Sequence, residues 1–173
     1  MKKFISLMIL LTVFLSACGA QAQAPAAGHY AGRVEGSNAF IGLVTNGEQV
    51  QAFFCDGTVE AAPVLWGWFR GDLTGNAFDL TNEKGDRLAG EFSTNGANGT
   101  ITLTDGTALN FQAEPVSQPA GVYRLEETID GAASVTSWII LANGELRGGR
   151  DGGTQLIADP GQQNGWIDII DWN

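Results

Sequence analysis

The chain has few histidine and cysteine residues that could act as a general base or as a thiol nucleophile in catalysis. Its 173 residues include one histidine, His29, and two cysteines, Cys18 and Cys55. A Ser-His-Asp triad needs a histidine held in a folded wall, and the sequence has no G-x-S-x-G motif around a serine. Cys55 could act only with His29 as its base, and two unrelated residues of a sheet are the simpler interpretation. The residue types therefore argue against a nucleophilic enzyme.

Carboxylates are abundant, with 19 Asp and Glu residues. Glycoside hydrolysis needs two carboxyl groups about 5 to 10 Å apart, but so many acids in a small chain meet that distance by chance. Calcium needs only oxygen ligands, and acids are frequent among the glycines of the last 23 residues. Zinc would need several His or Cys ligands, so we expect no cofactor. The weak calcium candidates are Asp151 and Asp159, with Asp168 and Asp171 further on, and a solvated acidic turn is the favoured interpretation of them.

Tryptophans are the most informative side chains. Trp66 and Trp68 are two residues apart among other apolar residues, so a strand would place both indoles on one face. Trp138 begins a second apolar run, Trp138 to Leu141. Such residues either fill a core with the indole N–H hydrogen-bonded, or line a surface that binds a small apolar ligand or a sugar ring. Trp66, Trp68 and Trp138 are therefore the candidate ligand-binding residues.

The N-terminus carries the features of an export signal. Two lysines precede an uncharged apolar run, Phe4 to Leu15, which is too short to span a bilayer, so residues 1–17 are expected to be a signal peptide. Leu15-Ser16-Ala17-Cys18 resembles the lipobox of bacterial lipoproteins. The resemblance implies cleavage before Cys18 and acylation of that cysteine by diacylglycerol and usually a third chain such as palmitate. The alternative is an ordinary secretory signal with an incidental cysteine.

The expected signal peptide and lipid anchor lead to several further expectations. Residues 18–27 are typical of a lipid-anchored tether, because they are uncharged and have no apolar periodicity. The location is then extracytoplasmic, on the bacterial cell membrane or outer membrane. A lipidated Cys18 leaves Cys55 without an intrachain partner, so we expect a buried thiol, with a reactive thiol or an intermolecular disulfide as the alternatives. The net charge of −10 would repel phosphate backbones, which argues against nucleic acid as a partner.

From residue 28 onward, short strand-like runs alternate with turns of Gly next to Asn or Asp. The clearest hairpin has Asp105-Gly106 between two alternating runs, 100–104 and 107–113. Regular hairpins predict an all-β, antiparallel up-and-down meander that closes into a single barrel over residues 28–173, with a β-sandwich as the alternative. The expected strands are 29–35, 39–45, 49–55, 64–70, 76–82, 87–93, 99–104, 107–113, 121–127 and 134–142.

A repeated set of short motifs suggests two related halves, 28–114 and 120–173. Gly28-His29-Tyr30 is matched by Gly121-Val122-Tyr123, and Asn46-Gly47-Glu48 by Asn143-Gly144-Glu145. The apolar tail 166–172 is expected to be a closing strand, or a segment that docks onto a partner. The chain also resembles secreted bacterial β-domains with repeated short elements and no known activity. The elements that carry this resemblance are Gly121-Val122-Tyr123, Cys55-Asp56-Gly57, Trp68-Phe69-Arg70-Gly71 and Ser137-Trp138-Ile139-Ile140-Leu141.

These observations lead to one expected function and two alternatives. We expect a membrane-anchored, non-enzymatic lipoprotein that binds a small molecule, a glycan or an envelope protein. A structural or protein-interaction lipoprotein without a small ligand is the first alternative, and a hydrolase is the second. A ligand binder should have a cavity of a few hundred Å³ lined by tryptophan, whereas an interaction protein should have packed indoles and an exposed apolar patch.

Overall fold

The fold consists of β-strands. The computed structural model describes residues 27–151 and 153–156, which contain eleven strands. None of these residues forms a helix long and apolar enough to span a membrane. The strands are β1 (Gly28–Val34), β2 (Phe40–Thr45), β3 (Gln49–Cys55), β4 (Trp66–Asp72), β5 (Ala77–Thr81), β6 (Arg87–Ser93), β7 (Gly96–Thr102), β8 (Ala108–Val116), β9 (Gly121–Ile129), β10 (Ala132–Ile140) and β11 (Leu146–Arg150).

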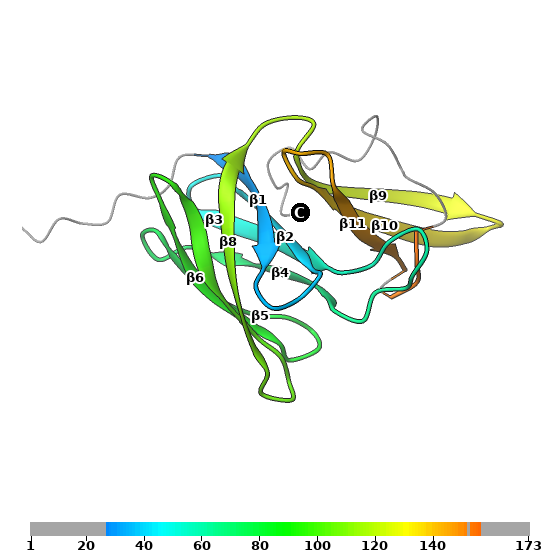
Figure 1. Ribbon diagram of the computed structural model, residues 1–173, viewed down its shortest axis with the longest axis horizontal. Coiled ribbons are helices and arrows are strands. Elements are labelled where there is room, and N and C mark those ends of the chain that lie inside the picture. The colour runs from blue at the N-terminus through cyan, green and yellow to red at the C-terminus, as the bar shows by residue number, and fades with distance from the viewer. Residues whose placement is uncertain (1–26, 152, 157–173) are drawn as a thin grey trace, which may run out of the picture.

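The first eight strands form one antiparallel sheet in the order β4-β3-β2-β1-β8-β7-β6-β5. Each strand lies beside a neighbour in sequence, and β1 also pairs with β8, so the sheet curls back on itself (Figure 1). The two ends of the order, β4 and β5, meet at a seam that no strand ladder closes; an isolated bridge joins Thr74 to Ala77 there. The predicted all-β up-and-down meander is therefore confirmed, as a barrel with one unsealed seam.

The barrel interior is a side-chain core. Alternate residues of each strand point inward, as in β5, where Phe78 and Leu80 are buried and Asp79 is exposed. Aromatic and branched aliphatic residues fill this space, so the interior is packed by the chain itself. Its large members are Tyr30, Val34, Ile41, Leu43, Val50, Phe54, Phe69, Phe78, Leu80, Leu88, Phe92, Ile101 and Phe111.

Strands β9 to β11 form a separate three-stranded antiparallel sheet, in the order β11-β10-β9. This sheet packs against the outer side of the barrel, where it contacts β1, β2 and β3 (Figure 1). Strands β2 and β3 are thus covered on both faces, which explains why nearly all their residues are buried. The apolar layer between the two sheets consists of Ala31, Phe40, Val44, Phe53, Cys55, Val122, Ile139 and Leu141.

Gly42 in β2 sets the close approach of the two sheets. A Cβ atom added to Gly42 would lie 2.7 Å from Cβ of Val122 and 3.4 Å from Cγ1 of Ile139. Any side chain at this position would collide with β9, so the absence of one lets the second sheet rest directly on β2.

The predicted elements agree with the structure in most places. The hairpin at Asp105-Gly106 is confirmed, because β7 and β8 pair across it and Gly106 has a positive φ of 88°. Strand β11 is absent from the predicted set, since its residues lack alternation and include Gly148 and Gly149. The signal peptide, Cys18, most of the tether, Asp159, Asp168, Asp171 and the tail 166–172 lie outside the described residues.

Candidate functional site

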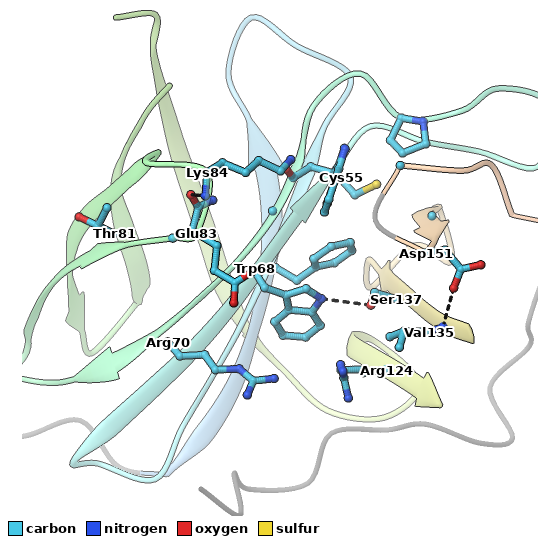
Figure 2. Close-up of a pocket in the computed structure, with 17 residues that line it drawn as sticks. Cys55, Trp68, Arg70, Thr81, Glu83, Lys84, Arg124, Val135, Ser137 and Asp151 are labelled. Atoms are coloured by element: carbon cyan, nitrogen blue, oxygen red, sulfur yellow. Dashed lines mark hydrogen bonds between the residues drawn. The ribbon is translucent and has the colours of Figure 1, made fainter. Parts of the chain in front are cut away.

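An open cleft lies between the barrel and the three-stranded sheet (Figure 2). Its volume is about 630 Å³, which falls in the range of small-ligand sites. Strands β3 and β4 form one wall, β9 to β11 form the opposite wall, and the turn between β5 and β6 forms the rim. The main lining side chains are Phe53, Cys55, Trp66, Trp68, Arg70, Asn82, Glu83, Lys84, Arg124, Val135, Ser137 and Asp151.

The strand register places these side chains on the facing surfaces. In the barrel, Phe53 lies opposite Trp68 across the β3–β4 ladder, and both point out of the barrel. In the second sheet, Arg124 lies opposite Ser137 across the β9–β10 ladder. Because paired residues share a face and faces alternate along a strand, each wall of the cleft is a row of paired residues.

Trp68 is the centre of the cleft. Its indole N–H donates a hydrogen bond of 3.1 Å to Oγ of Ser137, which ties the two walls together. The ring stacks on Phe53, with centroids 4.9 Å apart and an interplanar angle of 28°. Phe53 therefore covers one face of the indole, and the half-buried ring contributes to the lining of the cleft. Figure 2 shows this ring in the middle of the lining residues.

Trp66 has a different environment. The Nζ atom of Lys84 lies 3.1 Å from the centroid of the indole ring and donates a hydrogen bond to the Trp66 carbonyl. Burial lowers the pKa of Lys84, and the charge of Asp86 opposes that shift. A cation held over an indole face in this way is favourable. Lys84 thus covers one face of the Trp66 ring.

Trp138 does not reach the cleft. It follows Ser137 directly in β10, so its side chain points to the opposite face of the three-stranded sheet. There it is fully buried and stacks on Tyr123, with centroids 5.2 Å apart and an interplanar angle of 9°. Its indole N–H has no hydrogen-bond acceptor among the described residues, contrary to the expectation for a buried tryptophan. The structure therefore brings Trp66 and Trp68 together and keeps Trp138 apart.

Cys55 and His29 are not placed for joint chemistry. His29 lies opposite Val44 and Val44 lies opposite Gln51, so His29 is level with a residue four positions before Cys55, about 13 Å along the strand direction. Burial raises the pKa of the Cys55 thiol to about 12, although a hydrogen bond from the backbone N–H of Gly57 lowers it slightly. Such a thiol is a poor nucleophile.

The calcium candidate Asp151 has a structural role. Its carboxylate accepts hydrogen bonds from the backbone N–H of Val135, at 2.8 Å, and from Oγ of Ser134, at 3.1 Å. These bonds hold the pKa of Asp151 below its usual value. Among the described residues, no three His, Cys, Asp or Glu side chains gather closely enough to hold a metal ion. Asp151 thus secures the end of β11 against β10.

Most polar residues of the cleft are not among those that the sequence singles out. Arg70 has a detectable signal, because it continues the outward-pointing alternation of Trp66 and Trp68. No such sequence signal marks Arg124, Ser137 or Lys84, since these residues reach the cleft from separate strands and turns.

Comparison with known proteins identifies no relative. No protein-family model matches the chain, and neither the curated proteins nor the solved structures contain a significant match. Any inference about function therefore depends on the geometry of the site.

Proposed function

We propose that this protein is a non-enzymatic binding protein that takes a small organic ligand into the cleft between its barrel and its three-stranded sheet. The observation that carries this proposal is the half-buried indole of Trp68, which stacks on Phe53 and lines a cleft of about 630 Å³. Aromatic platforms with a few convergent polar groups are typical of such sites. The position of this platform is fixed by its hydrogen bond to Ser137.

We also propose that the protein is a lipoprotein, held on the outer side of a bacterial membrane by acyl chains on Cys18. The lipobox-like Leu15-Ser16-Ala17-Cys18 and the apolar run before it support this part of the proposal. Two or more acyl chains make a durable membrane anchor. The ligand would then be a compound that the protein meets in the cell envelope.

The anchor is tested by labelling with a fatty acid in the producing bacterium. We expect Cys18→Ala to abolish the label and to leave the protein unprocessed or released from the membrane fraction. Cys55→Ala is the matched control, because Cys55 is buried in the folded domain and should keep the label. Continued labelling of Cys18→Ala would refute the anchor.

Ligand binding is tested by thermal denaturation of the purified protein with saccharides, lipids and small aromatic acids. A ligand at 100 times its dissociation constant adds about 2.7 kcal/mol to the free energy of unfolding, which raises the melting temperature by several degrees. We expect Trp68→Leu to abolish the shift. Trp138→Phe should preserve it, because Trp138 lies on the other face of its sheet. An equal shift in Trp68→Leu would contradict the proposed site.

The two alternatives have weaker support. For a protein-interaction role, the exposed large apolar residues of the described chain are Val59 and Val64, 38% and 85% exposed, and two valines make a small patch. For a hydrolase, Asp151 lines the cleft but has a lowered pKa, whereas a general acid needs a raised one. Ligand binding without catalysis is therefore the function that the geometry supports best.

A further inference from the structure

The three-stranded sheet is buried on the face that points away from the barrel. On that face, Tyr123 and Trp138 are fully buried and Ile140 is 4% exposed. These residues form an apolar cluster with Leu125 and Leu146, separate from the barrel core and from the layer between the sheets. A sheet face open to water would leave part of such large rings exposed, so further atoms must cover this one.

The described strands do not supply this cover. The barrel strands in close contact with the sheet are β1, β2 and β3, and they meet its other face. All apolar residues of the outer cluster belong to β9, β10 and β11 themselves. Two turns reach the margins of the face. The Pro119 carbonyl accepts a hydrogen bond from the Tyr123 hydroxyl, and the Gly57 carbonyl accepts one from the backbone N–H of Gly148. The centre of the face, at Trp138, therefore needs a cover from another part of the chain.

The same face holds two buried hydrogen-bond donors that find no acceptor within the described part of the chain. They are the indole N–H of Trp138 and Nε of Arg150. Arg150 pairs with Thr136 in the β10–β11 ladder, and Thr136 lies two residues before Trp138, so both donors are on the same side of the sheet. Nε of Arg150 lies 3.6 Å from Oδ2 of Asp151, which is too far for a hydrogen bond. A buried donor without a partner is unfavourable, so the cover should bring acceptors as well as apolar surface.

The last described residue, Leu156, lies near this face. It is 1% exposed, and its backbone N–H donates a hydrogen bond of 3.3 Å to the Thr58 carbonyl. Thr58 follows Gly57, which is hydrogen-bonded to β11. The next 17 residues, 157–173, can extend about 56 Å at about 3.3 Å per residue. Three strands are about 10 Å wide and a nine-residue strand is about 30 Å long, so this segment is long enough to cross the face.

The apolar tail, residues 166–172, has the composition that this face requires. It contains two tryptophans and three isoleucines, which match an apolar cluster of aromatic and aliphatic residues. Its two other residues are Asp168 and Asp171, and a carboxylate is a strong acceptor for a guanidinium N–H. The tail has no Lys or Arg that would repel Arg150. Its backbone carbonyls are acceptors for an indole N–H.

We propose that the apolar tail packs on the outer face of the three-stranded sheet, with its apolar side chains on Trp138 and a carboxylate on Arg150. Strand β10 is then covered on both faces, by the barrel through Ile139 and by the tail through Trp138. The tail supports from behind the strand that presents Ser137 to the cleft. This inference does not depend on the ligand, because the outer face and the cleft lie on opposite sides of the sheet.

Photo-crosslinking of the full chain tests the position of the apolar tail. The probe, p-benzoylphenylalanine, replaces Leu125, a half-buried residue of the outer cluster. After irradiation, the monomer is isolated and digested with trypsin. The chain has no Lys or Arg after Arg150, so trypsin releases residues 151–173 as one peptide. We expect cross-links to residues 166–172. The same probe at Leu109, half-buried against the barrel core, is the matched control and should capture no residue of the tail.

Substitutions test the apolar and the charged contacts separately. Ile169→Asn combined with Ile170→Asn should lower the melting temperature by about 5 °C or more, because it buries polar groups in an apolar cluster. Val64→Asn is the matched control and should change it little, since Val64 is 85% exposed. Asp168→Asn combined with Asp171→Asn should also lower the melting temperature. That effect should be largely lost in an Arg150→Gln background, where the carboxylate has no partner.

The outcomes decide the occupant of the face. A covalent dimer, with the Leu125 probe on the tail of another molecule, would overturn the intrachain contact and identify a second copy as the cover. Cross-links that avoid residues 166–172 altogether would overturn the proposal outright, as would an unchanged melting temperature in the isoleucine variant. If that variant does not fold, the cross-link in the otherwise unchanged chain still decides. The proposed ligand site stands or falls separately, through Trp68.

Discussion

The first three strands and the last three are built alike but end in different environments. In both meanders, a strand beginning with Gly and carrying Tyr two residues later is followed by a second strand and a turn of Asn, Gly and Glu. Tyr30 of the first meander points into the barrel core, and Tyr123 of the second points away from the barrel. The two meanders thus pack back to back, through the faces opposite their tyrosines. The cleft adjoins the apolar layer between these faces, since Phe53 and Cys55 belong to both.

The surroundings of each meander depend on the next segment of the chain. Strand β3 leads into β4, and the chain then continues round the barrel. Strand β11 ends at Arg150, next to Asp151, which binds back to β10. Similar local sequences therefore do not ensure similar surroundings. Burial, rather than turn chemistry, distinguishes the two regions.

The largest loss of stability should come from a substitution in the apolar layer between the meanders. Ile139→Ala should lower the free energy of unfolding by about 2–5 kcal/mol, because Ile139 is fully buried there. Ile101→Ala, in the barrel core, is the matched variant and should cost a similar amount. Chemical denaturation followed by circular dichroism should show one transition for both. A separate early transition in Ile139→Ala alone would show that the second sheet unfolds independently.

Gly42→Val should push the two meanders apart through steric overlap. Its side chain would overlap Val122, at a cost of about 1–3 kcal/mol, measured by the same denaturation. Gly106→Asn is a suitable control, because that turn has open space and asparagine tolerates its positive φ. If Gly42→Val were as stable as the wild type, the close contact with β9 would be wrong.

Cys55 should make stability depend on alkaline pH. Its folded-state pKa of about 12 lies above the 9.0 of an ordinary thiol, so the unfolded chain releases the proton first. The contribution is complete below about pH 9 and is lost as pH rises toward 12. In that window the free energy of unfolding should fall about 1.4 kcal/mol per pH unit more steeply than in Cys55→Ala. Equal slopes would indicate an accessible thiol, which a thiol reagent at neutral pH would also detect.

The smallest loss of stability should come from substitutions in the two matching turns, which begin at Asn46 and Asn143. The Asn46 side chain accepts hydrogen bonds from the backbone N–H of Glu48 and Gln49, whereas Asn143 accepts one backbone bond from Glu145 and donates its other bond to the exposed Glu145 carboxylate, where a bond contributes less. We expect Asn46→Ala to cost about 1 kcal/mol and Asn143→Ala about half as much, since each bond contributes modestly. Thermal unfolding of the two variants measures the difference. The reverse order would mean that the turns are not held by these bonds.

Much of the fold could be predicted from particular residues. The Asp105-Gly106 turn and the alternation around it locate β7 and β8, because a glycine with positive φ and a period of two are local properties. Strand β11 could not be predicted, since Gly148 and Gly149 have no side chains to alternate. Gly148 is suited to its place because a Cβ atom there would lie 2.6 Å from Trp138. That requirement comes from a neighbouring strand.

The candidate site could be predicted only in part. The spacing of Trp66 and Trp68 places them on one face, but the covering of Trp66 by Lys84 depends on a turn that comes after β5. Trp138 resembles them in sequence because its neighbours are equally apolar. Its exclusion results from the packing of the second sheet, which turns Ser137 toward the cleft and Trp138 away from it.

By itself, the sequence determined the strand pattern, the turns and the apolar faces, because these depend on residues close together along the chain. Tertiary structure decided which apolar face became barrel core, which became the layer between the sheets, and which residues line the cleft. It also decided that arginines from β4 and β9 line the same cleft as Trp68. The physical reason is that a strand has two faces that alternate identically, and only packing against other elements determines what each face meets.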